Sequence, residues 1–215
     1  MKTKKLANTI AYFFVFYYTV GLVGLSLPST RNLFTSLMPL SIAMSTLLLL
    51  LFHGRWRSAD ALVLFFVALT GYLIEVLGVA TGEIFGSYQY GKALGFQFLD
   101  TPLLIGVNWM MLSYCAFVIM QQTRLFVPLK VILSAALLVI YDVVLEPVAI
   151  KLDMWSWGGG SIPVQNYQAW FVISLIFVTT MHLAKIKTRN TVAPWLFGVQ
   201  LVFFLLLNVT LRIFL

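Results

Sequence analysis

The sequence predicts an all-α, polytopic integral membrane bundle with a cytoplasmic N-terminus. Hydrophobic residues make up 61% of the 215 residues and charged residues only 10%, whereas charged residues make up about 25% of a soluble domain. A bilayer core requires about 20 apolar residues per helix, and the chain contains about seven such runs. Basic residues concentrate in alternate connections between the runs, which indicates one consistent orientation.

The apolar runs follow one another along the whole chain. The first run follows the basic start MKTKK and has no small-residue cleavage site behind it, so we expect a retained helix rather than a signal peptide. Only two connections are long, Gly82 to Asp100 and Lys151 to Asn166. Because no linker or internal repeat divides the chain, we expect one transmembrane domain over residues 1–215. The expected helices cover approximately residues 6–27, 33–53, 59–81, 101–122, 128–150, 167–186 and 192–214.

The basic residues orient this bundle. Ten of the fourteen lie at the N-terminus or beside the connections after the second, fourth and sixth runs, which share one side of the membrane. By the positive-inside rule that side is cytoplasmic, so we expect a multi-pass protein of the cell's inner, cytoplasmic membrane. The net charge of +7 then reflects topology, and no nucleic-acid partner is expected. The ten are Lys2, Lys4, Lys5, Arg55, Arg57, Arg124, Lys130, Lys185, Lys187 and Arg189.

The composition also limits the chemistry. Cys115 is the single cysteine, which excludes an intrachain disulfide, a CxxC redox pair and a cysteine-rich metal site. His53 and His182 are far apart in the sequence, which disfavours a histidine metal site. The last predicted helix has no lysine to form a retinal Schiff base, and no phosphate-binding loop or Ser/His/Asp set is recognisable. We therefore expect no metal site.

Acidic residues show the opposite asymmetry and gather toward the outer end. An ionisable group at membrane depth is costly unless it faces the bundle interior and finds a partner, so it indicates a functional site. Glu75, Asp142 and Glu146 meet that condition, and i, i+4 spacing places the latter two on one helix face. Two like acids in a low-dielectric site do not readily both ionise, so one is expected to keep the proton that a general acid needs. The alternative is structural pairing with Lys151, Lys92 or backbone donors. The six acids at this end are Glu75, Glu83, Asp100, Asp142, Glu146 and Asp153.

Two aromatic-rich connections accompany these acids. The stretch TGEIFGSYQYGKALGFQFLD combines glycines that permit tight turns with aromatic rings. It is either an interfacial aromatic belt or a loop that caps a polar pocket. The stretch WSWGGGSIPVQNYQAWF leaves a similar choice between belt residues and rings that stabilise a developing cation. The candidate substrate-binding residues are Glu83, Tyr88, Tyr90, Asp100, Asn108, Trp109, Trp155, Trp157, Asn166 and Trp170.

Four motifs occur in order along the middle of the chain: GEIFGSYQYG, TPLLIGVNW, YDVVLEPVA, and WSW followed by IPVQNYQAWF. Their combination resembles the carotenoid biosynthesis membrane protein family of the carotenoid 1,2-hydratase type, which includes gamma-carotene 1'-hydratases and bisanhydrobacterioruberin hydratases. The resemblance covers approximately residues 75–170. One departure is YQAW, where the family pattern has a glycine before the tryptophan. The matching residues are Glu75, Gly78, Thr81, Gly82, Phe85, Gly86, Tyr88, Tyr90, Pro102, Trp109, Asp142, Glu146, Pro147, Ala149, Trp155, Trp157, Pro163, Asn166, Tyr167 and Trp170.

The resemblance implies a cofactor-free hydro-lyase that adds water across the terminal C1=C2 double bond of an acyclic carotenoid end group, of lycopene, gamma-carotene or C50 type. Protonation of the alkene gives a tertiary cation that water captures, so the site needs a desolvated acid and a positioned water. We expect Asp142 or Glu146 to donate the proton, and Glu75 or the other member of the pair to activate water. The carotenoid would enter from the lipid bilayer, and other carotenoid biosynthesis enzymes are candidate partners. The residues expected to stabilise the cation are Trp155, Trp157 and Tyr88.

Two other functions stay open at this stage. A carotenoid end-group cyclase or isomerase would begin with the same protonation and then lose a proton instead of capturing water, so only the mass of the product separates it from a hydratase. A proton-coupled transporter would use membrane acids as a relay. It predicts acids spread through the membrane depth and internal repeats, whereas the acids here are confined to one end.

Overall fold

The computed structural model describes residues 2–186 and 189–213, so Lys187 of the basic set lies outside the described residues. Most of these residues are helical, and the four short strands lie in the α4–α5 and α6–α7 connections. In chain order the elements are α1 (Lys2–Ser26), α2 (Pro28–Ser36), α3 (Met38–Leu51), α4 (Ser58–Thr81), β1 (Tyr88–Tyr90), β2 (Gln97–Phe98), β3 (Thr101–Pro102), α5 (Leu103–Gln121), α6 (Val127–Lys151), β4 (Trp155–Trp157), α7 (Val164–Leu183) and α8 (Ala193–Ile213).

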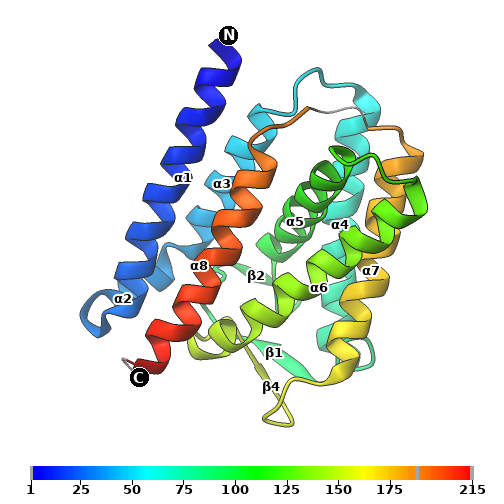
Figure 1. The fold of residues 1–215 in the computed structure, drawn as a ribbon. Coiled ribbons are helices and arrows are strands. Elements are labelled where there is room, and N and C mark those ends of the chain that lie inside the picture. The colour runs from blue at the N-terminus through cyan, green and yellow to red at the C-terminus, as the bar shows by residue number, and fades with distance from the viewer. Residues whose placement is uncertain (1, 187–188, 214–215) are drawn as a thin grey trace.

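Successive helical segments run in alternating directions when α2 and α3 are taken together (Figure 1). The N-terminus and the connections α3–α4, α5–α6 and α7–α8 lie at one end, which we call the basic end. The four strands and the C-terminal end lie at the other, the capped end. The basic connections thus gather at one end as expected, while the assignment of that end to the cytoplasm stays a prediction.

Fewer helices qualify as membrane spans than the seven predicted. Within the described residues five helices are long and apolar enough, α1, α4, α5, α6 and α8, and the bent pair α2–α3 brings the number to six. The remaining long helix, α7, has Gln165, Asn166 and Gln168 in its first turns, and such polar residues lower its hydropathy. The structure therefore supports a membrane bundle with five to six candidate spans.

The second predicted helix is bent rather than continuous. It divides at Leu37 into α2 and α3, whose axes differ by 54°. Pro39 lies in the first turn of α3, where it supplies no N–H to a carbonyl of the preceding turn, so α2 does not continue through it. Pro28 marks the start of α2 in the same way, directly after α1 has ended at Ser26.

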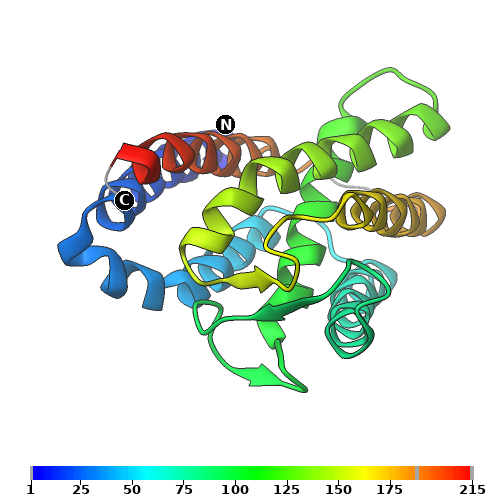
Figure 2. The same ribbon diagram turned by 90° about the horizontal axis from the view of Figure 1, so that it is seen from below.

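The two long connections pair with each other over the capped end. Strand β1 pairs antiparallel with β4, and the register sets Tyr88 opposite Trp157 and Tyr90 opposite Trp155. Seen from this end, the pair lies across the ends of the helices (Figure 2). Tyr88, Trp155 and Trp157 are each less than one-tenth exposed. This part of the loop is therefore a cap, although Phe96 farther along it is 74% exposed.

Helix α5 lies at the centre of the bundle. It contacts α3, α4, α6, α7 and α8, and every residue from Trp109 to Val118 is buried. Helices α1 and α2 lie on one side of it, and α4 and α7 lie on the other (Figure 2). The capped ends of α4, α5, α6 and α7 thereby converge beneath the β1–β4 pair.

Candidate active site

Glu75 is the buried carboxylate that α4 contributes beneath the cap. Its Oε2 accepts hydrogen bonds from the hydroxyls of Tyr88 at 2.6 Å and Tyr90 at 2.7 Å. Its Oε1 accepts one from Nε1 of Trp109 at 2.7 Å. Three donors from β1 and α5 therefore hold this side chain in one orientation, and hydrogen bonds to a carboxylate are stronger than those between neutral groups.

The two tyrosines of β1 keep their protons at neutral pH. Burial first, and then the neighbouring Glu75 carboxylate, raise the pKa of Tyr88 and of Tyr90 above the usual value for tyrosine. Both hydroxyls are thus permanent donors toward Glu75. Glu75 is therefore an acceptor whose position is fixed by three donors.

Asp142 and Glu146 lie on one face of α6, as their spacing predicts, because the same amide reaches both. Nδ2 of Asn166 lies 2.7 Å from Oδ2 of Asp142 and 3.3 Å from Oε1 of Glu146. Oε2 of Glu146 accepts the indole N–H groups of Trp155 at 3.1 Å and Trp157 at 2.9 Å. Together with Glu75, these two carboxylates form what we call the acid cluster.

One oxygen of the acid cluster is left without a donor. Oδ1 of Asp142 is buried and has no hydrogen-bond partner among the described residues. Such an oxygen is rare, because a buried polar atom without a partner is costly. It is a position where a proton could reside or where another molecule could bind.

A small cavity separates Glu75 from Glu146. Its volume is about 20 Å³, and a single water molecule requires about 10–15 Å³ on this measure. The cavity therefore has room for about one water between two carboxylates. Its other lining residues are Phe85, Tyr88, Tyr90, Ile105, Trp155, Trp157, Asn166 and Trp170.

Aromatic rings form most of the cavity wall. Tyr88 and Trp157 pack with ring centroids 5.3 Å apart, and Tyr90 and Trp155 with centroids 6.1 Å apart. These are the cross-strand pairs of β1 and β4. Ring faces attract positive charge, so a cation in this space would be stabilised on several sides.

The structure separates the other predicted site residues from the acid cluster. Glu83 and Asp100 are exposed; Asp100 lies in the turn between β2 and β3 at a φ of 57°, a backbone that aspartate tolerates better than most residues. Asp153 is likewise exposed, with a φ of 54°. Of the six acids at this end, only the three of the acid cluster come together. Asn108 lines a different pocket, while its neighbour Trp109 binds Glu75.

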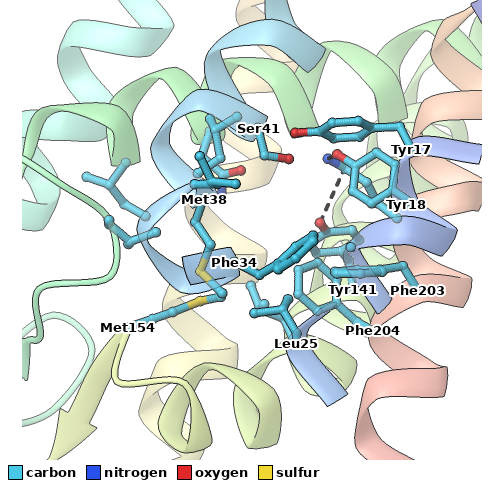
Figure 3. Close-up of a pocket in the computed structure, with 18 of the residues that line it drawn as sticks. Tyr17, Tyr18, Leu25, Phe34, Met38, Ser41, Tyr141, Met154, Phe203 and Phe204 are labelled. Atoms are coloured by element: carbon cyan, nitrogen blue, oxygen red, sulfur yellow. Dashed lines mark hydrogen bonds between the residues drawn. The ribbon is translucent and has the colours of Figure 1, made fainter. Parts of the chain in front are cut away.

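That second pocket lies beside the acid cluster and was not predicted. It has a volume of about 150 Å³ and a mainly apolar lining drawn from α1, α2, α3, α5, α6 and α8 (Figure 3). Gln200 of α8 donates to the hydroxyl of Tyr18 at 2.7 Å and accepts from that of Tyr141 at 3.4 Å. Asn108 and Trp155, two of the predicted substrate-binding residues, also line this pocket, whereas Gln200 was not among the predicted residues.

The histidines take no part in the acid cluster. At the basic end, Nδ1 of His53 lies 2.8 Å from the hydroxyl of Tyr114, and its Nε2 lies 3.4 Å from Oδ2 of Asp60. Asp60 also pairs with Arg57. Over residues 2–186 and 189–213, no three His, Cys, Asp or Glu side chains are grouped so that they could hold a metal ion.

Comparison with known proteins agrees with the motifs. The model of a family described as carotenoid biosynthesis protein matches residues 33–215. Bisanhydrobacterioruberin hydratase from Haloarcula japonica is 29% identical over 155 residues, which are 66% of this chain and 53% of that protein. The match thus spans about half the length of that relative. No solved structure matches the chain.

Proposed function

Because the chain belongs to the carotenoid biosynthesis protein family, we propose that it is an enzyme that adds water across the terminal C1=C2 double bond of an acyclic carotenoid end group. The observation that carries this proposal is the cavity with room for about one water between Glu75 and Glu146, walled by tyrosine and tryptophan rings. The name of the Haloarcula japonica relative supports the same reaction class.

Glu146 is the proposed proton donor. It lines the cavity, whereas Asp142 does not. Two indole N–H groups occupy its Oε2, which leaves Oε1 to carry the proton. Asp142 lies one helical turn away and shares the amide of Asn166. Because two neighbouring carboxylates in a buried site do not readily both ionise, Asp142 helps the pair to retain a proton.

Transfer of that proton to C2 leaves a tertiary cation at C1. The rings of Tyr88, Trp155 and Trp157 surround this charge, and the Glu75 carboxylate stabilises it across the cavity. The positioned water then forms a bond to C1 and gives one proton to Glu75. Since Glu75 and Glu146 line the same cavity, a further water can return that proton to Glu146, so that the net change is addition of one water.

The test is expression in hosts that accumulate lycopene, gamma-carotene or an acyclic C50 precursor, with the extracted pigments separated and their masses measured by mass spectrometry. We expect a more polar pigment that is heavier by one water for each end that reacts. The Glu146→Gln variant, inserted in the membrane to the same level, serves as the inactive control. Unchanged lycopene, gamma-carotene and C50 precursor with the wild-type protein present in the membrane would refute the hydratase.

The mass of the product also separates the nearest rival. A cyclase or isomerase that uses the same protonation would return a pigment of unchanged mass, because the cation loses a proton instead of gaining water. A cavity with room for about one water beside the acid favours hydration. Neither protonation followed by hydration nor protonation followed by proton loss requires a cofactor.

We also propose that α7 crosses the membrane with the six candidate spans, because it runs between the two ends of the bundle (Figure 1). Its polar residues Gln165, Asn166 and Gln168 lie in its first turns, at the capped end. Seven crossings would put the N-terminus in the cytoplasm and the C-terminus outside the inner membrane.

A further inference from the structure

The cavity between Glu75 and Glu146, which we call the acid cavity, is too small for the substrate that the proposed function requires. At about 20 Å³ it has room for about one water, and a branched alkene end group needs several times that space. The reacting carbons must therefore approach the acid cluster from an adjoining space.

The second pocket (Figure 3) is such a space, and we call it the large pocket because it exceeds the cavity between the acids. Its volume is about 150 Å³, and an apolar cavity of about this size binds a ligand of about six carbon atoms, which is roughly one isoprenoid unit. Its wall consists mainly of aliphatic and aromatic side chains, including Leu25, Phe34, Ile42 and Phe203. This lining fits an apolar end group and offers no ion pair to a charged ligand.

The pocket and the acid cavity share two lining residues. Ile105 and Trp155 line both spaces. On α6, Tyr141 and Leu145 line the large pocket, and each directly precedes one of the acids in the sequence. The two spaces therefore adjoin at Ile105 and Trp155, and Nε1 of Trp155 is itself bound to Glu146.

The pocket also reaches the outer surface of the bundle. Val20 of α1 and Leu37, at the bend between α2 and α3, line it and are each about two-fifths exposed. Both belong to the helical surfaces that a membrane would cover. A long polyene could thus place one end in the pocket while the rest of its chain stays among lipid chains.

We infer that this pocket binds the terminal isoprenoid unit of the polyene substrate, and that Ile105 and Trp155 form the partition across which the end group meets Glu146. The inference rests on the proposed function for the identity of the ligand. It adds a binding site built by α1, α2, α3 and α8, which contribute nothing to the acid cluster.

The test measures lycopene binding by the full-length protein purified in detergent. Quenching of tryptophan fluorescence gives the affinity, because Trp155 lines the pocket and a bound polyene accepts its excitation energy. Two variants fill the pocket without removing a hydrogen bond, Ile42→Phe and Gly21→Leu. A Cβ at Gly21 would lie 3.5 Å from the ring of Phe203, so the larger side chain extends over that ring into the pocket.

The matched controls make similar changes on the exposed surfaces of the same helices. Leu40→Phe and Val23→Leu alter residues that are 61% and 54% exposed. We expect the two pocket variants to bind lycopene about tenfold more weakly than the wild type, while the controls bind as it does. All four variants should elute as the wild type does in size-exclusion chromatography, which shows that they are folded.

The outcomes separate this inference from the proposed function. If filling variants and controls bind lycopene equally, or if the wild type does not bind it, the pocket assignment is wrong even where hydrated pigment is formed. If the filling variants alone lose binding, the pocket is supported even where no hydrated pigment appears in the expression test.

Discussion

The three carboxylates of the acid cluster differ in their hydrogen-bond donors, and this difference assigns their roles. Glu75 is held by three donors from β1 and α5, so it is an acceptor with a fixed orientation. Glu146 has two indole donors on one oxygen and a weakly held second oxygen. Asp142 has one donor and one oxygen without a partner among the described residues. Only Glu146 combines an oxygen available for a proton with a position on the cavity.

The first prediction concerns the proton donor. Glu146→Gln keeps an oxygen that can accept the indole N–H groups but removes the acidic proton, so the hydration rate should fall by about 100-fold or more. Asp142→Asn should reduce the rate less, because Asp142 does not line the cavity. The measurement is hydrated pigment formed per unit of membrane-inserted protein.

Glu83→Gln is the matched control for this pair. It removes a carboxylate at the same end of the bundle, but Glu83 is exposed, so the rate should stay at the wild-type level. A Glu146→Gln variant as active as the control would contradict the assignment, and a larger loss in Asp142→Asn would move the donor role to that residue.

The sequence predicts the three acids and most of the residues that bind them, but it does not predict which residue binds which acid. Intramembrane depth and i, i+4 spacing sufficed to select Glu75, Asp142 and Glu146. Nothing in the spacing indicated that Trp109 would bind Glu75 while Trp155 and Trp157 bind Glu146. Those contacts depend on how helices and loops pack, which local sequence does not determine.

The β1–β4 pair is the element that assembles the site. It joins two connections that are far apart in the sequence, and its register sets Tyr90 opposite Trp155. One strand supplies two donors to Glu75 and the other supplies two donors to Glu146. A shift of one residue in register would turn these side chains to the opposite face and remove both sets of donors.

The second prediction tests this pair through Gly91, which follows β1. A Cβ at Gly91 would lie 2.0 Å from the carbonyl oxygen of Asp153, so Gly91→Ala requires the backbone of one connection to move. We expect a loss of about 1–3 kcal/mol in stability together with a loss of hydration activity. Thermal unfolding in detergent and pigment analysis measure the two effects.

Gly159→Ala provides the matched control on the other connection. A Cβ there meets no atom within 4 Å, so stability and activity should match the wild type. Equal behaviour of Gly91→Ala and Gly159→Ala would show that close contact between the two connections is not needed for the site.

The bend between α2 and α3 is a feature that the hydropathy pattern does not predict. Residues 33–53 have the hydropathy of one span, but Pro39 separates them into two helices with axes 54° apart. Hydropathy averages over the run and is insensitive to one residue that alters the backbone. The bend matters because Leu37 lies at it and lines the large pocket.

On the scale of the whole molecule, the two ends carry different chemistry. The acid cluster and the three exposed acids lie at the capped end, whereas the seventh acid, Asp60, pairs with Arg57 and His53 at the basic end. Between them α5 presents an uninterrupted buried run from Trp109 to Val118. A proton relay across the membrane would need acids at intermediate depths. The distribution therefore favours an enzyme with one active end over a transporter.

The last prediction concerns the orientation of these ends. The basic residues of the N-terminus and of the connections at the basic end should hold that end in the cytoplasm, so the acid cluster should face the outer leaflet. A reporter that is active only outside the inner membrane should work when fused after Leu215 and fail when fused before Met1. Insertion of the reporter at Gly54 should give no activity, and insertion at Gly159, in the exposed turn after β4, should give full activity. Reporter activity at both termini, or at neither, would mean an even number of crossings and would remove α7 or the α2–α3 pair from the spans. Activity at Gly54 but not at Gly159 would keep the seven crossings and invert the protein, so that the acid cluster would draw its water from the cytoplasm.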